Sequence, residues 1–157
     1  MVEVSVLPDA EMVAVQWAKS DTDIAAIVDG RVSTRLPTTG DITFPWLRVF
    51  TVAGATPNIE VPVTQAVLQW DAFAAGGGDL GVSPDLATAS LLARTLAAKI
   101  KQFDGYQAEP VNRRVEFGGE SAIIDGFTVA FGPVRQAEPD TGWARYRVDT
   151  TIRLRVG

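Results

Sequence analysis

The amino-acid sequence predicts an α+β fold: a single mixed or antiparallel β-sheet with one long and one short N-terminal helix packed on one of its faces. Two observations support this prediction. Helical spacing of apolar residues occurs only in the first two thirds of the chain, and the last third has the pattern of consecutive antiparallel strands. With 157 residues and no evident internal boundary, we expect a single domain over residues 1–157.

The chain opens with two helical segments. Asp9 is a natural N-cap for a helix over Ala10–Lys19, in which apolar residues recur at steps of three and four. Ser20 and Asp21 can cap a second, short helical turn that ends by Gly30, because glycine suits the left-handed position after a helix.

Strand and loop patterns then alternate. Arg31–Leu36 is β-prone, Pro37–Pro45 has the composition of a loop, and Trp46–Val52 is predicted to be extended. Ala53–Pro62 contains glycine, asparagine and two prolines, so we predict a second loop there. Val63–Phe73 alternates apolar and polar residues at the period of a half-buried strand.

The longest helix is predicted to follow Gly81. Ser83 is the expected N-cap, Pro84 the first helical residue, and Asp85 a favourable charge at the helix N-terminus. Apolar residues recur at helical spacing as far as Phe103, and the next glycine ends the pattern.

Three strands are predicted in the last third. They span Val111–Phe117, Ala122–Val134 and Trp143–Val156, with Gly118-Gly119 as the first turn. In the last strand we expect the even-numbered residues to face the core and the odd-numbered ones, mostly arginines, to face solvent.

Composition excludes several classes of chemistry. The chain has no cysteine and no histidine, so disulfides, thiolate metal sites, cysteine nucleophiles and the commonest general base are missing. The net charge is -5, and residues 1–104 carry 12 of the 19 acidic side chains, which disfavours stable binding to phosphate backbones. No segment approaches the ~18 apolar residues of a membrane span, and the N-terminus lacks a signal-like pattern, so we predict neither an anchor nor export.

One glycine-rich turn suggests a nucleotide site. Gly76, Gly78 and Gly81 satisfy the G-x-G-x-x-G pattern. Pro84 places the helix start after the third glycine, however, and Asp79 would put a carboxylate where pyrophosphate binds. We therefore predict a flexible strand-to-helix connection and no cofactor.

Other charged clusters have ordinary structural interpretations. The pairs Asp21–Asp23 and Glu138–Asp140 offer too few oxygen ligands for a hard cation, so we assign them to a helix start and a turn and predict no metal site. The basic residues near the end of the long helix, Lys99 among them, are predicted to be solvated.

Arginines alternate along the last predicted strand and would form a basic stripe with only Asp149 between them. This stripe is an ordinary solvated sheet face, an intersubunit surface or a DNA contact. Tryptophan and arginine are enriched in protein interfaces. The candidate interface residues are Trp46, Trp143, Arg145, Arg147, Arg153 and Arg155.

Several sequence blocks, taken in their joint order, resemble a known family. The blocks are Val15–Ala18, Val28–Val32 leading to Leu36-Pro37, Pro45–Val49, Val67–Asp71 before an alanine-rich helix, and Gly132–Arg135 through Asp140 to Arg145-Tyr146. Over nearly the whole chain they resemble the tail terminator, or tail-to-head joining, proteins of siphophages, particularly those of actinobacterial phages.

The resemblance implies a structural virion protein that is not an enzyme and needs no cofactor. Such a subunit assembles in the host cytoplasm as a ring, usually a hexamer, on the last ring of the major tail tube protein. There it stops tube polymerisation and presents a surface to the head-tail connector protein, while DNA passes through only as cargo. Ring closure requires two different complementary patches, for which the Pro37–Pro45 and Ala53–Pro62 loops are candidates.

Other functions remain open at this level. A head-completion or connector adaptor, or another minor tail protein, would share these blocks and bind portal-associated rings instead. A nucleotide-binding enzyme that uses the Gly76–Gly81 turn is the remote alternative from a different class.

Overall fold

A computed structural model of the chain describes residues 7–37, 42–58, 63–76, 83–103, 113–138 and 141–157. Within these ranges it contains three helices and one six-stranded sheet. In chain order the elements are α1 (Ala10–Ser20), α2 (Thr22–Val28), β1 (Val32–Ser33), β2 (Trp46–Asn58), β3 (Val63–Ala74), α3 (Leu86–Lys101), β4 (Arg114–Phe117), β5 (Glu120–Gln136) and β6 (Ala144–Val156).

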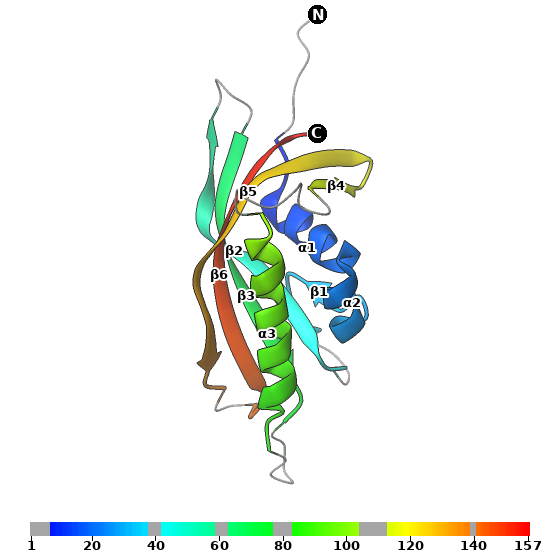
Figure 1. Cartoon of the computed structure of the whole chain (residues 1–157), viewed down its shortest axis with the longest axis vertical. Helices are drawn as coiled ribbons and strands as arrows, with labels where there is room; N and C mark the ends of the chain where they lie inside the picture. The colour runs from blue at the N-terminus through cyan, green and yellow to red at the C-terminus, as the bar shows by residue number, and fades with distance from the viewer. Residues whose placement is uncertain (1–6, 38–41, 59–62, 77–82, 104–112, 139–140) are drawn as a thin grey trace, which may run out of the picture.

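The strand order across the sheet is β1-β2-β3-β6-β5-β4. β1 pairs with β2 in parallel, and all other pairs are antiparallel. Figure 1 shows the long α3 lying along one face of this strongly twisted sheet, with α1 and α2 on the same side. The predicted α+β fold with a mixed sheet and helices on one face is therefore confirmed. We call the face opposite the helices the open face.

The two N-terminal helices are capped as predicted. The Asp9 carboxylate accepts hydrogen bonds from the backbone N–H groups of Glu11 and Met12 at 3.0 and 3.3 Å. Asp21 caps α2 in the same way, accepting from Asp23 and Ile24 at 3.0 and 3.1 Å. Each carboxylate thus satisfies two N–H groups that a helix N-terminus leaves without partners.

The predicted start of α3 is wrong by two residues. Asp85, not Ser83, is the N-cap, and Pro84 precedes the cap instead of opening the helix. The Asp85 carboxylate accepts from both the backbone N–H (3.1 Å) and the hydroxyl (2.6 Å) of Thr88. The Thr88 side-chain bond, followed by the backbone bond, lowers the pKa of Asp85. A residue that offers a carboxylate to both donors replaces the serine as the cap.

Several strands begin or end elsewhere than predicted. The segment 53–58 is not a loop, because β2 continues to Asn58 with register shifts after Thr51 and Ala53. This part of β2 lies at the sheet edge, where a residue without an N–H, such as Pro57, is tolerated. β1 covers only two residues of the β-prone Arg31–Leu36 segment, β5 extends beyond both predicted ends, and residues 111–112 lie outside the described ranges.

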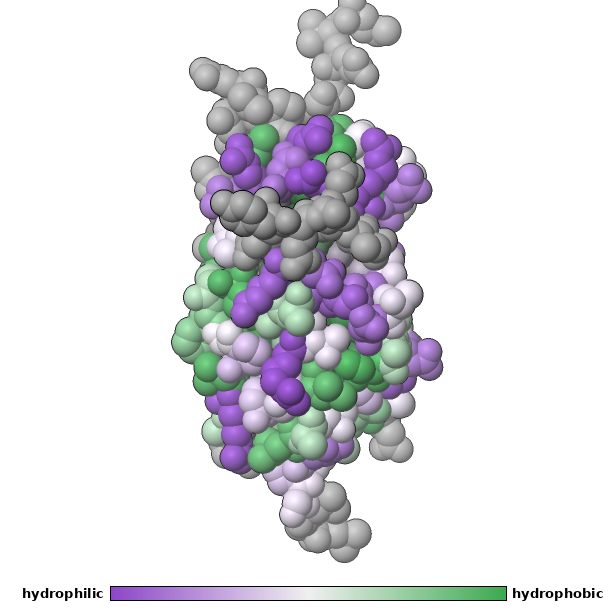
Figure 2. Space-filling view, in the orientation of Figure 1, coloured by the Kyte–Doolittle hydropathy of each residue, from purple (hydrophilic) through white to green (hydrophobic). Residues whose placement is uncertain are grey.

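The hydrophobic core lies between the helices and the sheet. At its centre the Trp17 ring of α1 packs edge-on against Trp70 of β3 and Phe127 of β5, with ring centroids 6.2 and 5.0 Å away. The Trp70 indole N–H donates to the Thr150 hydroxyl at 2.9 Å, which satisfies the one polar atom that this ring brings into the core. Figure 2 shows the outer surface of the helix side as a mosaic of hydrophilic and hydrophobic residues.

Part of the polar side of β3, and a lysine near the end of α3, contact other protein groups where solvent was predicted. Gln69 and Asp71 on the polar side of β3 are buried, so this strand is covered on both faces over part of its length. Lys99 is not a freely solvated cation, since its ammonium lies 2.5 Å from the Asp23 carboxylate and 3.7 Å from that of Asp21. The pair of carboxylates therefore serves to join α2 to α3.

Candidate interaction surface

The open face of the sheet is built by alternate residues of four strands. Arg48 of β2 lies opposite Asp71 of β3, which lies opposite Arg147 of β6. Arg147 in turn lies opposite Val134 of β5. The odd-numbered side chains of β6 occupy this face, and the even-numbered ones face the core or its margin, as the alternation predicts.

Asp71 is the centre of an ion network on this face. Its carboxylate is 0% exposed and accepts hydrogen bonds from Arg48 at 2.5 Å and from Arg145 at 2.9 Å. The Gln69 amide donates to it at 3.2 Å, and Arg145 also reaches Glu138 at 2.6 Å. A buried carboxylate needs partners of this kind, because without them desolvation would oppose its charge.

Aromatic rings flank the network near the Ala144 end of β6. The guanidinium groups of Arg48 and Arg145 lie 5.2 and 5.8 Å from the centre of the Phe73 ring. Trp143 packs edge-on against Phe73 and Phe44, with centroids 6.0 and 5.1 Å away. The cations are therefore held between carboxylates and ring faces, which favours one arrangement of their side chains.

The structure places the other predicted interface residues on the same face but does not join them into a basic stripe. Arg147 pairs with Asp149 at 2.8 Å, and this hydrogen bond is the main cause of the raised pKa of Arg147. Arg155 pairs with Asp125 at 2.8 Å. Arg153 is exposed and has no carboxylate within ion-pair distance among the described residues.

The predicted basic stripe is thus largely neutralised within the chain. Of its partners, Asp71 lies in β3, Asp125 lies in β5 and Glu138 lies in the segment that follows β5, so their pairing with the arginines depends on strand order and register. Trp46 is partly buried and its indole N–H donates to Ser33 at 2.8 Å. These contacts leave the interface role of the six predicted residues as a prediction.

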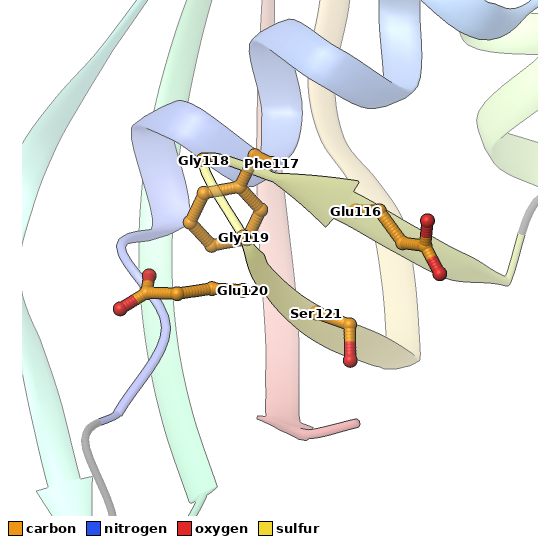
Figure 3. A pocket seen from close by; sticks show the side chains of 6 residues that line it. All are labelled: Glu116, Phe117, Gly118, Gly119, Glu120 and Ser121. Carbon is orange, nitrogen blue, oxygen red and sulfur yellow. The ribbon is translucent and has the colours of Figure 1, made fainter.

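Two surface hollows lie near β4. One, of about 420 Å³, lies at the β4–β5 hairpin, and a second, of about 330 Å³, lies between α1 and β4. Figure 3 shows the carboxylates of Glu116 and Glu120 at the first hollow directed away from each other. They do not converge on one bound group. In the described ranges no group of three or more acidic side chains is placed to hold a metal ion.

The glycine-rich turn lies mostly outside the described ranges, since residues 77–82 and hence Gly78, Asp79 and Gly81 are not covered; neither is Asp140. Gly76 is described. A Cβ atom there would lie 2.5 Å from the Pro84 Cα and 2.8 Å from the Gly142 carbonyl oxygen. Close packing of the chain therefore accounts for this glycine. None of the described helices has the length and apolar character needed to cross a membrane.

The comparisons with known proteins give a structural match. No family model matches the chain, and no curated protein sequence matches it. Among solved structures, a chain of the "virion of native gene transfer agent (GTA) particle" is similar, with a TM-score of 0.59 and 11% sequence identity. The match covers 93% of this chain and 94% of that chain. At this identity the likeness establishes a shared fold.

Proposed function

We propose that this protein is a structural component of a phage-like virion. The observation that carries the proposal is the match to a chain of a gene transfer agent virion, which spans nearly the full length of both chains. A small α+β subunit with one sheet face that carries no helix is suited to assembly with other proteins.

More specifically, we propose that the protein caps the head-proximal end of a tail tube as a ring, stops tube polymerisation and joins tail to head. The sequence resemblance to siphophage tail terminators supports this finer assignment. The partners would be further copies of the chain, the major tail tube protein and the head-tail connector protein. The net charge of -5 suits a lumen through which DNA passes as cargo, because carboxylates offer phosphates no binding energy.

We further propose that the role involves no catalysis. The chain has neither histidine nor cysteine, and the two carboxylates at the larger described hollow point apart. Thermal unfolding with and without NAD or ATP tests the alternative, since a ligand that binds the native state raises the Tm. A rise in Tm with either ligand would contradict the proposal that the chain has no nucleotide site.

Electron microscopy of lysates from cells that produce the particle without this gene tests the tail assignment. Tails of uncontrolled length are expected, because nothing would stop polymerisation. Tails of normal length that fail to join filled heads would favour the connector adaptor instead. Intact particles without the protein would contradict both assignments.

A solution experiment separates the partners. The purified chain is expected to be a weak oligomer alone and to form larger complexes with tail tube protein, as measured by light scattering. A chain that stays monomeric with tube protein, and binds portal-associated rings instead, would contradict the terminator assignment.

A further inference from the structure

At each side of the sheet, a long stretch of strand borders no other strand in the described part of the chain. One stretch belongs to β2 and the other to β5. β1 pairs with β2 only at Leu47 and Arg48, and β4 pairs with β5 only from Glu120 to Ile123. The remainder of β2 and of β5 forms the margins of the sheet. Margins of this kind are where another chain can dock.

Exposed apolar side chains gather at these two margins. The six exposed large apolar side chains of the described ranges include Phe131 (48%) and Val134 (37%) on β5, Val52 (45%) on β2, and Met12 (41%) on α1. Met12 adjoins the β2 margin, because its neighbour Glu11 accepts a hydrogen bond from the Thr51 backbone N–H at 2.8 Å. Four of the six therefore lie at the margins, where contact with a partner would remove them from water.

The two margins differ in charge. The exposed Arg135 lies next to Val134, whereas the exposed Asp9 and the partly exposed Glu11 lie next to Met12. We define the β5 edge patch as Phe131, Val134 and Arg135, and the β2 edge patch as Asp9, Glu11, Met12 and Val52. One patch is apolar and basic and the other is apolar and acidic, so each complements the other better than it complements itself.

Both patches lie at the same level of the sheet. Phe131 lies opposite Asp149 of β6, which lies opposite Gln69 of β3. Gln69 lies opposite Phe50, two residues before Val52. A second copy set beside the first, with little shift along the strands, therefore brings the β5 edge patch of one copy to the β2 edge patch of the next. Such head-to-tail contacts close into a ring when the rotation between copies divides a full turn.

We propose that the β5 edge patch of one subunit docks on the β2 edge patch of the next, through side chains and not through a continuous backbone ladder. The Thr51 N–H is already bonded to Glu11, and Pro133 within β5 has no N–H. Both edges therefore interrupt such a ladder. This inference rests on the ring assembly proposed above and names the surfaces that form it.

Cysteine cross-linking tests the proposal, because the chain has no cysteine of its own. The variants Val52→Cys and Phe131→Cys are prepared separately, mixed, and treated with a short bis-maleimide under conditions where light scattering detects oligomers, with tube protein added if needed. The mixture is expected to give covalent dimers that neither variant gives alone. Leu91→Cys on α3, exposed at 48% like Phe131, is the matched control and should give no covalent dimer with either variant.

The outcomes separate this inference from the proposed function. Oligomers that form without mixed cross-links, or single variants that link to themselves, would overturn the edge assignment and leave the ring intact. A chain that remains monomeric even with tube protein would overturn both. A Phe131→Ser variant adds a second measurement. Loss of this exposed ring, which the proposed contact would cover, should weaken self-association about tenfold to a hundredfold, with an unchanged circular dichroism spectrum.

Discussion

The two faces of the sheet are stabilised by different chemistry. The helix face is filled by apolar and aromatic side chains such as Trp17, Leu96 and Phe127, all at most 1% exposed. The open face carries Asp71 at an equally buried position, but surrounds it with arginines and ring faces. The centre of one sheet face can therefore be buried without a second layer of helices, provided that its charged groups are paired.

The largest effect is expected on the helix face. Trp17→Ala removes the ring that joins α1 to β3 and β5, and cavities of this size cost about 3–5 kcal/mol. Denaturant unfolding followed by circular dichroism measures the loss. A change below about 1 kcal/mol would show that the core can collapse around the gap.

The next largest effect is expected at the centre of the open face. Asp71→Asn keeps the shape of the side chain but leaves Arg48 and Arg145 without their shared counter-charge, at a cost of about 3 kcal/mol. The same unfolding measurement applies. Asp149→Asn, which removes only the partner of Arg147, is the matched control and should cost less; equal losses would contradict the central role of Asp71.

A smaller effect is expected at the ion pairs that join α2 to α3. The hydrogen bond to Asp23 is the main cause of the raised pKa of Lys99. A raised pKa stabilises the fold fully below the unfolded value, and this stabilisation is lost as the pH rises through the folded pKa. Lys99→Met should therefore cost about 0.5 kcal/mol at neutral pH.

The pH dependence gives the control for this pair. The difference between the wild type and Lys99→Met should shrink as the pH is raised above about 10.4, the ordinary lysine value. A difference that stays constant from pH 7 to pH 11 would mean that packing of the lysine stem, not its charge, is responsible.

The smallest effect is expected at the exposed end of the open face. Arg155 and Asp125 are 50% and 29% exposed, so solvent screens their attraction. Arg155→Gln should change the free energy of unfolding by less than about 0.5 kcal/mol. A loss similar to that of Asp71→Asn would show that the whole face, and not only its centre, depends on ion pairs.

Much of the fold could be predicted from the sequence because it depends on local patterns. The caps Asp9 and Asp21, the turn at Gly118-Gly119 and the alternation of β6 all follow from neighbouring residues. The limits of β2 could not be predicted in this way. Turn-forming residues in 53–58 favour a loop, but pairing of this segment with β3 overrides them.

The ion pairs of the open face could not be predicted from the sequence. The arginines of β6 were visible as candidates, but their partners come from β3, from β5 and from the segment that follows β5. Which carboxylate meets which arginine depends on strand order and register, and a shift by one residue would send every one of these side chains to the other face. The burial of Asp71 was missed for the same reason, since its own strand shows only ordinary alternation.

The distribution of tryptophans offers a built-in spectroscopic reporter. Trp17 and Trp70 lie in the core between the helices and the sheet and are at most 1% exposed. Trp46 and Trp143 are partly exposed and lie on the open face near the Ala144 end of β6. A protein that covers the open face would change the fluorescence emission of the second pair. The emission of the first pair would stay unchanged. Replacing Trp46 and Trp143 by phenylalanine would silence that signal while global unfolding remained visible through the core.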